Sequence, residues 1–264
     1  GGAKRMMEDG LFEQCPMDAV FGMHNWPGAA TGSMGVTAGP MMASSNEFEV
    51  IIKGKGAHAA QPHMGIDPIM VAVQIAQSWQ TIISRNKNPI DAGVLSITQI
   101  HSGSATNIIP DSASLIGTVR TFTLGALDLI EKRMREIADH TAAAFGTTVH
   151  FEFKRNYPPL INHEQETAFA IDVMQSVVGN AQVITKIEPT MGAEDFSYML
   201  QAKPGAYVFI SNGDGAHREM GHGGGPCTLH NPSYDFNDDL IPLGGTYWVE
   251  LATQWLAQTG PSKP

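Results

Sequence analysis

Two hydrophobic periodicities alternate through the middle of the chain. Phe48, Val50 and Ile52 alternate with charged residues, which is the two-residue period of a half-buried strand. Asp67-Pro68 then offers a helix N-cap and a proline at the first helical position. The apolar residues that follow at helical spacing are Ile69, Ala72, Val73, Ala76, Trp79 and Ile83. This stretch predicts a strand followed by an amphipathic helix.

Strand and helix periodicities recur in the segments that follow. Two strand-like runs cover residues 93–100 and 112–122, an amphipathic helix comes next, and a last strand alternates from Val149 to Phe153. The apolar face of that helix comprises Leu127, Ile130, Met134, Ile137, Ala138 and Thr141. The order β-α-β-β-α-β over residues 47–158 predicts a ferredoxin-like domain, a four-stranded antiparallel sheet with both helices on one face. Its other face is left bare, and we expect a second copy of the domain to cover it.

The flanks, residues 1–46 and 159–264, have a different pattern. The first contains a helix, a short strand near residues 19–22 and a glycine-rich segment. The second predicts helices over 164–178, 194–200 and 243–256, with strands over 183–187 and 206–211. Alternating strands and helices predict an α/β sheet domain, into which the ferredoxin-like domain is inserted.

Composition and charge remove several classes of function. The net charge of −10 argues against a nucleic-acid partner, which would favour a basic surface. No apolar run approaches the ~20 residues that span a bilayer, so we expect no membrane partner. Cys15 and Cys227 are the only cysteines and are far apart, which predicts no disulfide framework and a cytoplasmic protein. The chain runs from Gly1 straight into a helical stretch without an N-cap; this predicts a truncated or processed chain, unless Gly1-Gly2 is an expression scar.

Two histidines occur where strands give way to turns. His24 lies in Gly-Met-His-Asn-Trp-Pro and His230 in Leu-His-Asn-Pro, and α/β sheets bind ligands at such strand ends. Neutral imidazole is a common zinc ligand. Taken singly, each is better interpreted as a hydrogen-bonded turn histidine, and two histidines cannot complete a catalytic zinc site, which takes at least three protein ligands.

Other polar segments also allow structural interpretations. His217, His222 and Cys227 crowd one loop, but their spacing matches no standard zinc motif and the nearby glycines indicate a flexible loop. The segment 54–65, which contains His58 and His63, is consistent with a tight strand-to-helix connection whose histidines face water. Likewise, residues 107–110 could form only a turn, and Arg120 could be an exposed strand charge.

In order along the chain, these segments resemble the M20 metallopeptidase family, specifically its amidohydrolase branch with hippurate hydrolases and plant auxin-conjugate hydrolases. The matching segments are GGAKRMMEDGLF (1–12), GMHNWP (22–27), GKGAHAAQPHMGIDP (54–68), ATNIIPDSA (105–113), TVRTF (118–122), MGAEDFS (191–197) and LHNPSYDFND (229–238). Each segment is weak evidence alone, whereas the ordered set is specific and covers nearly the whole chain. The resemblance implies a zinc-peptidase-like catalytic domain with an inserted ferredoxin-like lid and dimerisation domain.

The resemblance also implies a site with two divalent metal ions (Zn, Mn or Co). Its ligands would be a Cys and a His from a CGHDxH-type motif, a Glu from a Glu-Glu pair, and two later histidines matched by His24 and His230. The first three, and the neighbouring Glu that acts as general base, would precede Gly1. We therefore expect this polypeptide alone to be inactive.

Further roles come from the same resemblance. His58 matches the lid histidine that reaches the oxyanion from the partner subunit. Asn107 and Arg120 match lid residues that hold the substrate, and Gly192 and Glu194 match a turn that lines the pocket. His63 matches a family position without an assigned role.

Three functions are compatible with these observations. The leading hypothesis is hydrolysis of N-acyl amino acids by a cytoplasmic homodimer that forms through the lid. The second is a non-catalytic binding or regulatory protein that uses the ferredoxin-like domain, and the third is a dipeptidase or deacylase of the same fold. Metal dependence separates the second from the others, and a substrate panel separates the first from the third.

Overall fold

The computed structural model describes residues 1–218 and 224–259, and the chain folds into two compact mixed α/β units. Unit 1 comprises Gly1–Met41, Ile161–Pro189 and Tyr198–Pro264, and unit 2 comprises Met42–Leu160 and Thr190–Ser197. Residues 190–197, which were expected in the flanking α/β domain, belong to unit 2.

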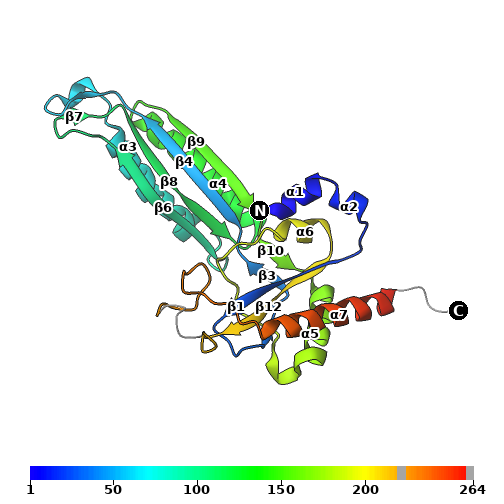
Figure 1. Ribbon diagram of the computed structural model, residues 1–264. Helices are drawn as coiled ribbons and strands as arrows, with labels where there is room; N and C mark the ends of the chain where they lie inside the picture. The colour runs from blue at the N-terminus through cyan, green and yellow to red at the C-terminus, as the bar shows by residue number, and fades with distance from the viewer. Residues whose placement is uncertain (219–223, 260–264) are drawn as a thin grey trace. The chain divides into compact units, whose positions relative to one another are not determined.

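Unit 2 is built on a four-stranded antiparallel sheet of strand order β6-β8-β4-β9. The strands are β4 (Ser45–Lys53), β6 (Gly93–Ser102), β8 (Ser112–Thr121) and β9 (Val149–Tyr157), and the helices are α3 (Pro68–Thr81) and α4 (Leu124–Ala144). The chain order is β4-α3-β6-β8-α4-β9, the order that the hydrophobic pattern predicted. Figure 1 shows both helices on the same side of the sheet.

The two helices of unit 2 are fixed by capping and by one buried aromatic residue. The carboxylate of Asp67 accepts the backbone N–H of Ile69 at 2.9 Å, and Pro68 is the first helical residue, so α3 begins where the sequence indicated. Trp79 is fully buried, and its indole N–H donates to the carbonyl of Met134 on α4 at 3.0 Å. This bond satisfies the indole N–H inside the apolar core.

Smaller elements complete unit 2. Strands β5 (Ala57–His58) and β7 (Ile108–Ile109) form a two-stranded sheet, and a short 3-10 helix, η1, covers Pro62–Met64. A π-helical turn, η2 (Ile82–Asn86), follows α3.

Unit 1 contains a second four-stranded sheet, of order β1-β12-β2-β11. Its strands are β1 (Val20–Pro27), β2 (Met34–Gly35), β11 (Val183–Ile184) and β12 (Gly205–Gly213). Strands β1 and β12 are parallel, β12 and β2 antiparallel, and β2 and β11 parallel. The helices of this unit are α1 (Gly2–Glu8), α2 (Leu11–Gln14), α5 (Glu164–Val178), α6 (Ser197–Ala202) and α7 (Leu240–Thr259), with η3 (Asn180–Gln182).

The core of unit 1 forms around β12, because all nine of its residues are buried. Every second residue of this strand, Ala206, Val208 and Ile210, packs in one cluster with apolar residues of α5 and α7. In addition, β3 (Gly39–Met42) and β10 (Leu160–Asn162) pair as a separate two-stranded sheet.

Several predicted bounds were wrong. The strand expected near residues 19–22 runs to Pro27, because β1 continues to pair with β12 beyond the point where its alternation ends. The strand predicted over 183–187 has two residues, and the helix predicted over 194–200 begins at Ser197. Both cysteines are free, as expected from their spacing. Of the helices that the structure describes, none has the length and apolarity to cross a membrane.

Candidate functional site

His24 lies in β1, opposite Phe209 of the neighbouring strand β12. Its side chain is half-buried, and its Nδ1 lies 2.6 Å from the carbonyl oxygen of Asn25. A carbonyl oxygen only accepts, so the hydrogen bond assigns the ring proton to Nδ1. The neutral ring then keeps Nε2 free as a ligand nitrogen. Trp26, two residues on, stacks on Phe209 with ring centroids 4.4 Å apart and fixes this part of the strand.

His230 has a strained backbone. Its φ of 63° makes it the one non-glycine residue with positive φ in the described ranges. It lies inside a turn in which the N–H of Asn231 donates to the carbonyl of Thr228 at 3.2 Å, and its side chain is exposed. Left-handed backbone in a non-glycine residue costs on the order of 1–3 kcal/mol and is concentrated at functional sites. The strain supports a functional interpretation of His230.

A side-chain hydrogen bond joins the two histidine segments. The amide of Asn25, next to His24, donates to the hydroxyl of Tyr234, four residues after His230. Burial raises the pKa of Tyr234, and nearby Cys227 and Asp235 raise it further. The raised pKa keeps the hydroxyl protonated near neutral pH, and its oxygen is the acceptor in this contact.

The donor set in unit 1 fits part of a metal site. His24 and His230 offer two imidazoles, but residues 1–218 and 224–259 contain no cluster of three or more His, Cys, Asp or Glu side chains suited to a metal ion. A catalytic zinc ion needs at least three protein ligands. The described residues therefore supply two candidate ligands and not a complete site.

The His217 loop shows no zinc site among its described residues. The Nε2 of His217 lies 3.1 Å from the carbonyl oxygen of Asp235, and the Sγ of Cys227 lies 3.6 Å from the same oxygen. Both side chains are thus engaged with one backbone carbonyl. His222 lies outside the described residues.

His58 and Asn107 lie together in unit 2. His58 is the register partner of Ile108 in the β5–β7 sheet, and the N–H of Ala59 donates to the carbonyl of Asn107 at 3.0 Å. The Nδ1 of His58 accepts the N–H of Ala60 at 3.1 Å, so its neutral ring carries the proton on Nε2. Because both side chains are exposed, His58 can offer Nε2–H as a hydrogen-bond donor.

Arg120 lies in the four-stranded sheet, and not in the two-stranded β5–β7 sheet that contains His58. It is half-buried near the end of β8, and its Nη1 donates to the carbonyl of Ser44 at 3.3 Å. Strand β8 begins at Ser112, shortly after β7, so the strand rise of about 3.4 Å per residue separates Ser112 from Arg120 by about 27 Å. Arg120 is therefore not brought close to His58 and Asn107 within one chain.

Gly192 and Glu194, the other predicted pocket residues, make local hydrogen bonds. The carbonyl of Gly192 accepts the N–H of Ala43 at 2.9 Å, and the carboxylate of Glu194 accepts the N–H of Phe196 at 3.4 Å. His63 is exposed on η1.

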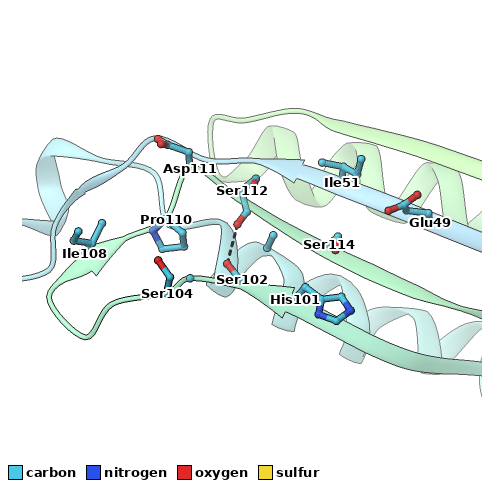
Figure 2. Close-up of a pocket in the computed structure, with 12 residues that line it drawn as sticks. Glu49, Ile51, His101, Ser102, Ser104, Ile108, Pro110, Asp111, Ser112 and Ser114 are labelled. Carbon is cyan, nitrogen blue, oxygen red and sulfur yellow. Dashed lines mark hydrogen bonds between the residues drawn. The ribbon is translucent and has the colours of Figure 1, made fainter.

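Unit 2 contains a cavity of about 620 Å³ that was not expected from the sequence. Figure 2 shows Ile108 and Pro110 at one end of it and Glu49 and His101 at the other. The other lining residues are Ile51, Ser102, Gly103, Ser104, Asp111, Ser112, Ala113 and Ser114. Its carboxylates, from Glu49 and Asp111, disfavour an anionic ligand, and Arg120 does not line it. The segment 105–113 contributes only part of the lining, and the remaining residues come from β4, β6, the start of β8 and the residues after β6, so no single motif marks this cavity.

Comparison with known proteins places the chain in a family. The model of "Peptidase family M20/M25/M40" matches residues 1–254, and the chain belongs to this family. It is 36% identical to an N-acetyl-L-cysteine deacetylase of Bacillus subtilis over 99% of this chain and 59% of that protein. It is 33% identical to a hippurate hydrolase of Campylobacter jejuni over 97% of this chain and 64% of that protein. The chain thus spans roughly three fifths of the length of these relatives.

A solved structure agrees with the family assignment. The chain is similar to a dinuclear metal-binding peptidase of the M20 family from Bacillus subtilis, with a TM-score of 0.75 and 29% identity. The match covers 97% of this chain and 61% of that one. The mixed α/β fold is therefore that of an M20-type hydrolase.

Proposed function

We propose that this chain belongs to a metal-dependent amidohydrolase that cleaves the amide bond of N-acyl amino acids. The observation that carries the proposal is the ring geometry of His24 in a chain of the M20 family. The Nδ1 of His24 bonds the carbonyl oxygen of Asn25, which leaves its Nε2 available to a metal ion. N-acetylcysteine and hippurate, named in two relatives, are both N-acyl amino acids. They define the substrate class that we propose.

His24 and His230 are two of the ligands of a pair of divalent metal ions in this proposal. When bound, such ions polarise the scissile carbonyl and lower the pKa of a bound water. The other ligands and the general base belong to Cys-Gly-His-Asp and Glu-Glu segments, which residues 1–264 do not contain. Residues 1–264 alone therefore neither hold both ions nor turn over substrate.

Unit 2 acts as a ferredoxin-like lid in this account. The Nε2–H of His58 stabilises the oxyanion of the tetrahedral intermediate, a role worth about 3 kcal/mol in comparable enzymes. Asn107, beside it, offers a side-chain amide to the same substrate. We also assign Gly192 and Glu194 to the substrate pocket, on the family resemblance alone. We assign no role to His63.

Arg120 binds the free carboxylate of the substrate, because its guanidinium can donate to both oxygens at once. The separation of about 27 Å along β8 prevents Arg120 and the His58–Asn107 pair of one chain from contacting the same small substrate. We therefore assign Arg120 to one copy and His58 with Asn107 to its partner. This arrangement makes the homodimer part of the active site.

A second candidate, a non-catalytic ligand-binding protein, is favoured by the cavity of about 620 Å³ in unit 2. Its lining is shared between polar and apolar side chains, and its carboxylates suit a neutral or cationic ligand better than an N-acyl amino acid. Metal dependence separates the two candidates, because this cavity uses none of the residues that we assign to the reaction.

The proposed function is tested by hydrolysis of benzoyl-glycine, acetyl-amino acids and indole-acetyl-amino acids, with added Mn²⁺ or Zn²⁺. The complete gene product is compared with residues 1–264, and benzoyl-glycinamide is the matched substrate without a carboxylate. We expect metal-dependent turnover of the acids by the complete product only, with weak turnover of the amide. Absence of both turnover and metal binding in the complete product would favour the ligand-binding candidate.

A further inference from the structure

The loop that carries His230 follows β12 and is anchored to the end of that strand. Asn212, fully buried, donates from its amide to the carbonyl of Asp235 at 2.8 Å and accepts the N–H of Asn237 on its side-chain oxygen at 2.8 Å. This bidentate contact fixes the loop on the C-terminal side of His230. The residues before His230 are not held by this contact.

Arg218 makes a second contact. Its Nη1 donates to the carbonyl of Gly225 at 2.7 Å and to the carbonyl of Ser233 at 3.2 Å, and its Nε donates to the carbonyl of Gly215 at 3.2 Å. Gly225 precedes His230 and Ser233 follows it, so one guanidinium holds both limbs of the loop. A planar fork with several fixed donors suits such a cross-link, and a lysine ammonium does not reproduce it.

The two limbs are also in tight contact. A Cβ on Gly225 would lie 2.6 Å from the Oγ of Ser233, so the limbs approach as closely as a glycine allows. Between them, His230 is held at a φ of 63°. A strained conformation persists only where the surrounding structure over-determines it, and the Arg218 cross-link is part of that surrounding structure.

We propose that Arg218 is a positioning residue for His230, which it orients as a metal ligand without contacting the metal or the substrate. This inference rests on the ligand role of His230 in the proposed function. Residues that orient metal ligands typically change metal affinity by about 10–100-fold when they are replaced. Nothing in the sequence marks Arg218, because all three of its acceptors are backbone carbonyls.

The test compares Arg218→Met, Arg218→Lys and His230→Ala in the complete gene product. Zn²⁺ affinity is measured by competition with a chelator, and hydrogen exchange is followed at the N–H groups of Asn231 and Tyr234. We expect Arg218→Met to weaken Zn²⁺ binding by about 10–100-fold and to speed exchange in this loop only. Arg218→Lys should lie between Arg218→Met and the wild type. Arg85→Met, at an exposed arginine of unit 2 with a local bond to the carbonyl of Ser84, is the control and should change neither.

The outcomes separate the two hypotheses. Weaker Zn²⁺ binding in His230→Ala, with wild-type Zn²⁺ affinity or wild-type loop exchange in Arg218→Met, would refute the positioning role alone. Unchanged Zn²⁺ affinity in His230→Ala would refute the ligand assignment in the proposed function, and the positioning role with it.

Discussion

Gly117 of β8 is the register partner of Phe48 of β4, and the phenylalanine ring lies directly over the glycine α-carbon. A Cβ at Gly117 would lie 2.5 Å from the Cζ of Phe48 and 2.0 Å from the carbonyl oxygen of Ser96. Ser96 lies on the neighbouring edge strand β6, which is bulged between Ile97 and Gln99. The Ser96 carbonyl and the Phe48 ring together fill the space that a side chain at Gly117 would need.

Gly117→Ala should therefore destabilise the protein by about 1–3 kcal/mol, the usual cost of overpacking a core. Urea unfolding measures this change. The matched control is Gly125→Ala in the first turn of α4, where a Cβ would meet no atom within 4 Å. That substitution should stabilise by about 0.4–1 kcal/mol, because it reduces the entropy of the unfolded chain. Equal stability of the two variants would show that the approach of Phe48 to Gly117 is not tight.

The backbone of His230 gives a prediction that separates strain from metal binding. Both His230→Ala and His230→Gly should lose a bound metal ion from the complete gene product. In the metal-free state, however, the glycine variant should be more stable than the alanine variant by about 1–2 kcal/mol, because only glycine adopts left-handed backbone without cost. Urea unfolding in the presence of a chelator tests this order. An unchanged metal count would contradict the ligand role, and a more stable alanine variant would contradict the strain.

Tyr247 gives a pH-dependent prediction. Its hydroxyl is fully buried without a hydrogen-bond partner in the part of the chain that is described, and burial raises its pKa. A raised pKa contributes stability below the ordinary tyrosine value of about 10, and this contribution is lost as the pH rises above that value. Tyr247→Phe should stabilise the protein at neutral pH by about 1 kcal/mol, since it removes an unsatisfied hydroxyl.

The same variant should lose less stability than the wild type between neutral pH and pH ~11. Thermal or urea unfolding across this range measures the two slopes. Parallel slopes would mean that burial does not raise the pKa of this hydroxyl. A large loss of stability in Tyr247→Phe at neutral pH would mean that the hydroxyl has a hydrogen-bond partner.

His58→Ala tests the lid assignment separately from the metal ligands. In the complete gene product, kcat should fall by ~100-fold or more, because an oxyanion donor is lost. The metal content should remain unchanged, since His58 is not proposed as a ligand. Normal turnover would remove the assigned role, and loss of metal would point to a ligand role instead.

Much of unit 2 could be predicted from the sequence, because its helices and long strands have strong periodicity and clear start signals such as Asp67-Pro68. Strands β2, β5 and β7 could not, because two residues carry no period and each is defined only by its pairing partner. Strand β11 was predicted, but as a longer strand over residues 183–187. Helix α5 was predicted at its observed bounds, Glu164–Val178.

The candidate site was less accessible to sequence reasoning. His24 and His230 could be singled out by residue type, but the strand-end placement was wrong, because His24 lies inside β1 and His230 lies in a turn well after β12. The φ of His230 and the ring hydrogen bond of His24 required coordinates. The separation of Arg120 from Asn107 follows from the length of β8. The predicted strand over residues 112–122 already had this length, but matching the motifs of the two residues did not reveal their distance. The role of Arg218 could not be predicted from the sequence, because it binds backbone carbonyls, and any residue type supplies a backbone carbonyl.

The most direct test of the two-copy site is complementation between inactive variants of the complete gene product. Arg120→Ala and His58→Ala chains with different tags are co-expressed, and the mixed dimer is purified through both tags. If Arg120 and His58 of one site come from different copies, the mixed dimer contains one intact site, and about half of the wild-type activity returns in a two-fold symmetric dimer. The control pairs Asn107→Ala with His58→Ala, residues that we assign to the same copy, and should stay inactive. No recovery in the first pair, or equal recovery in both pairs, would contradict the two-copy site.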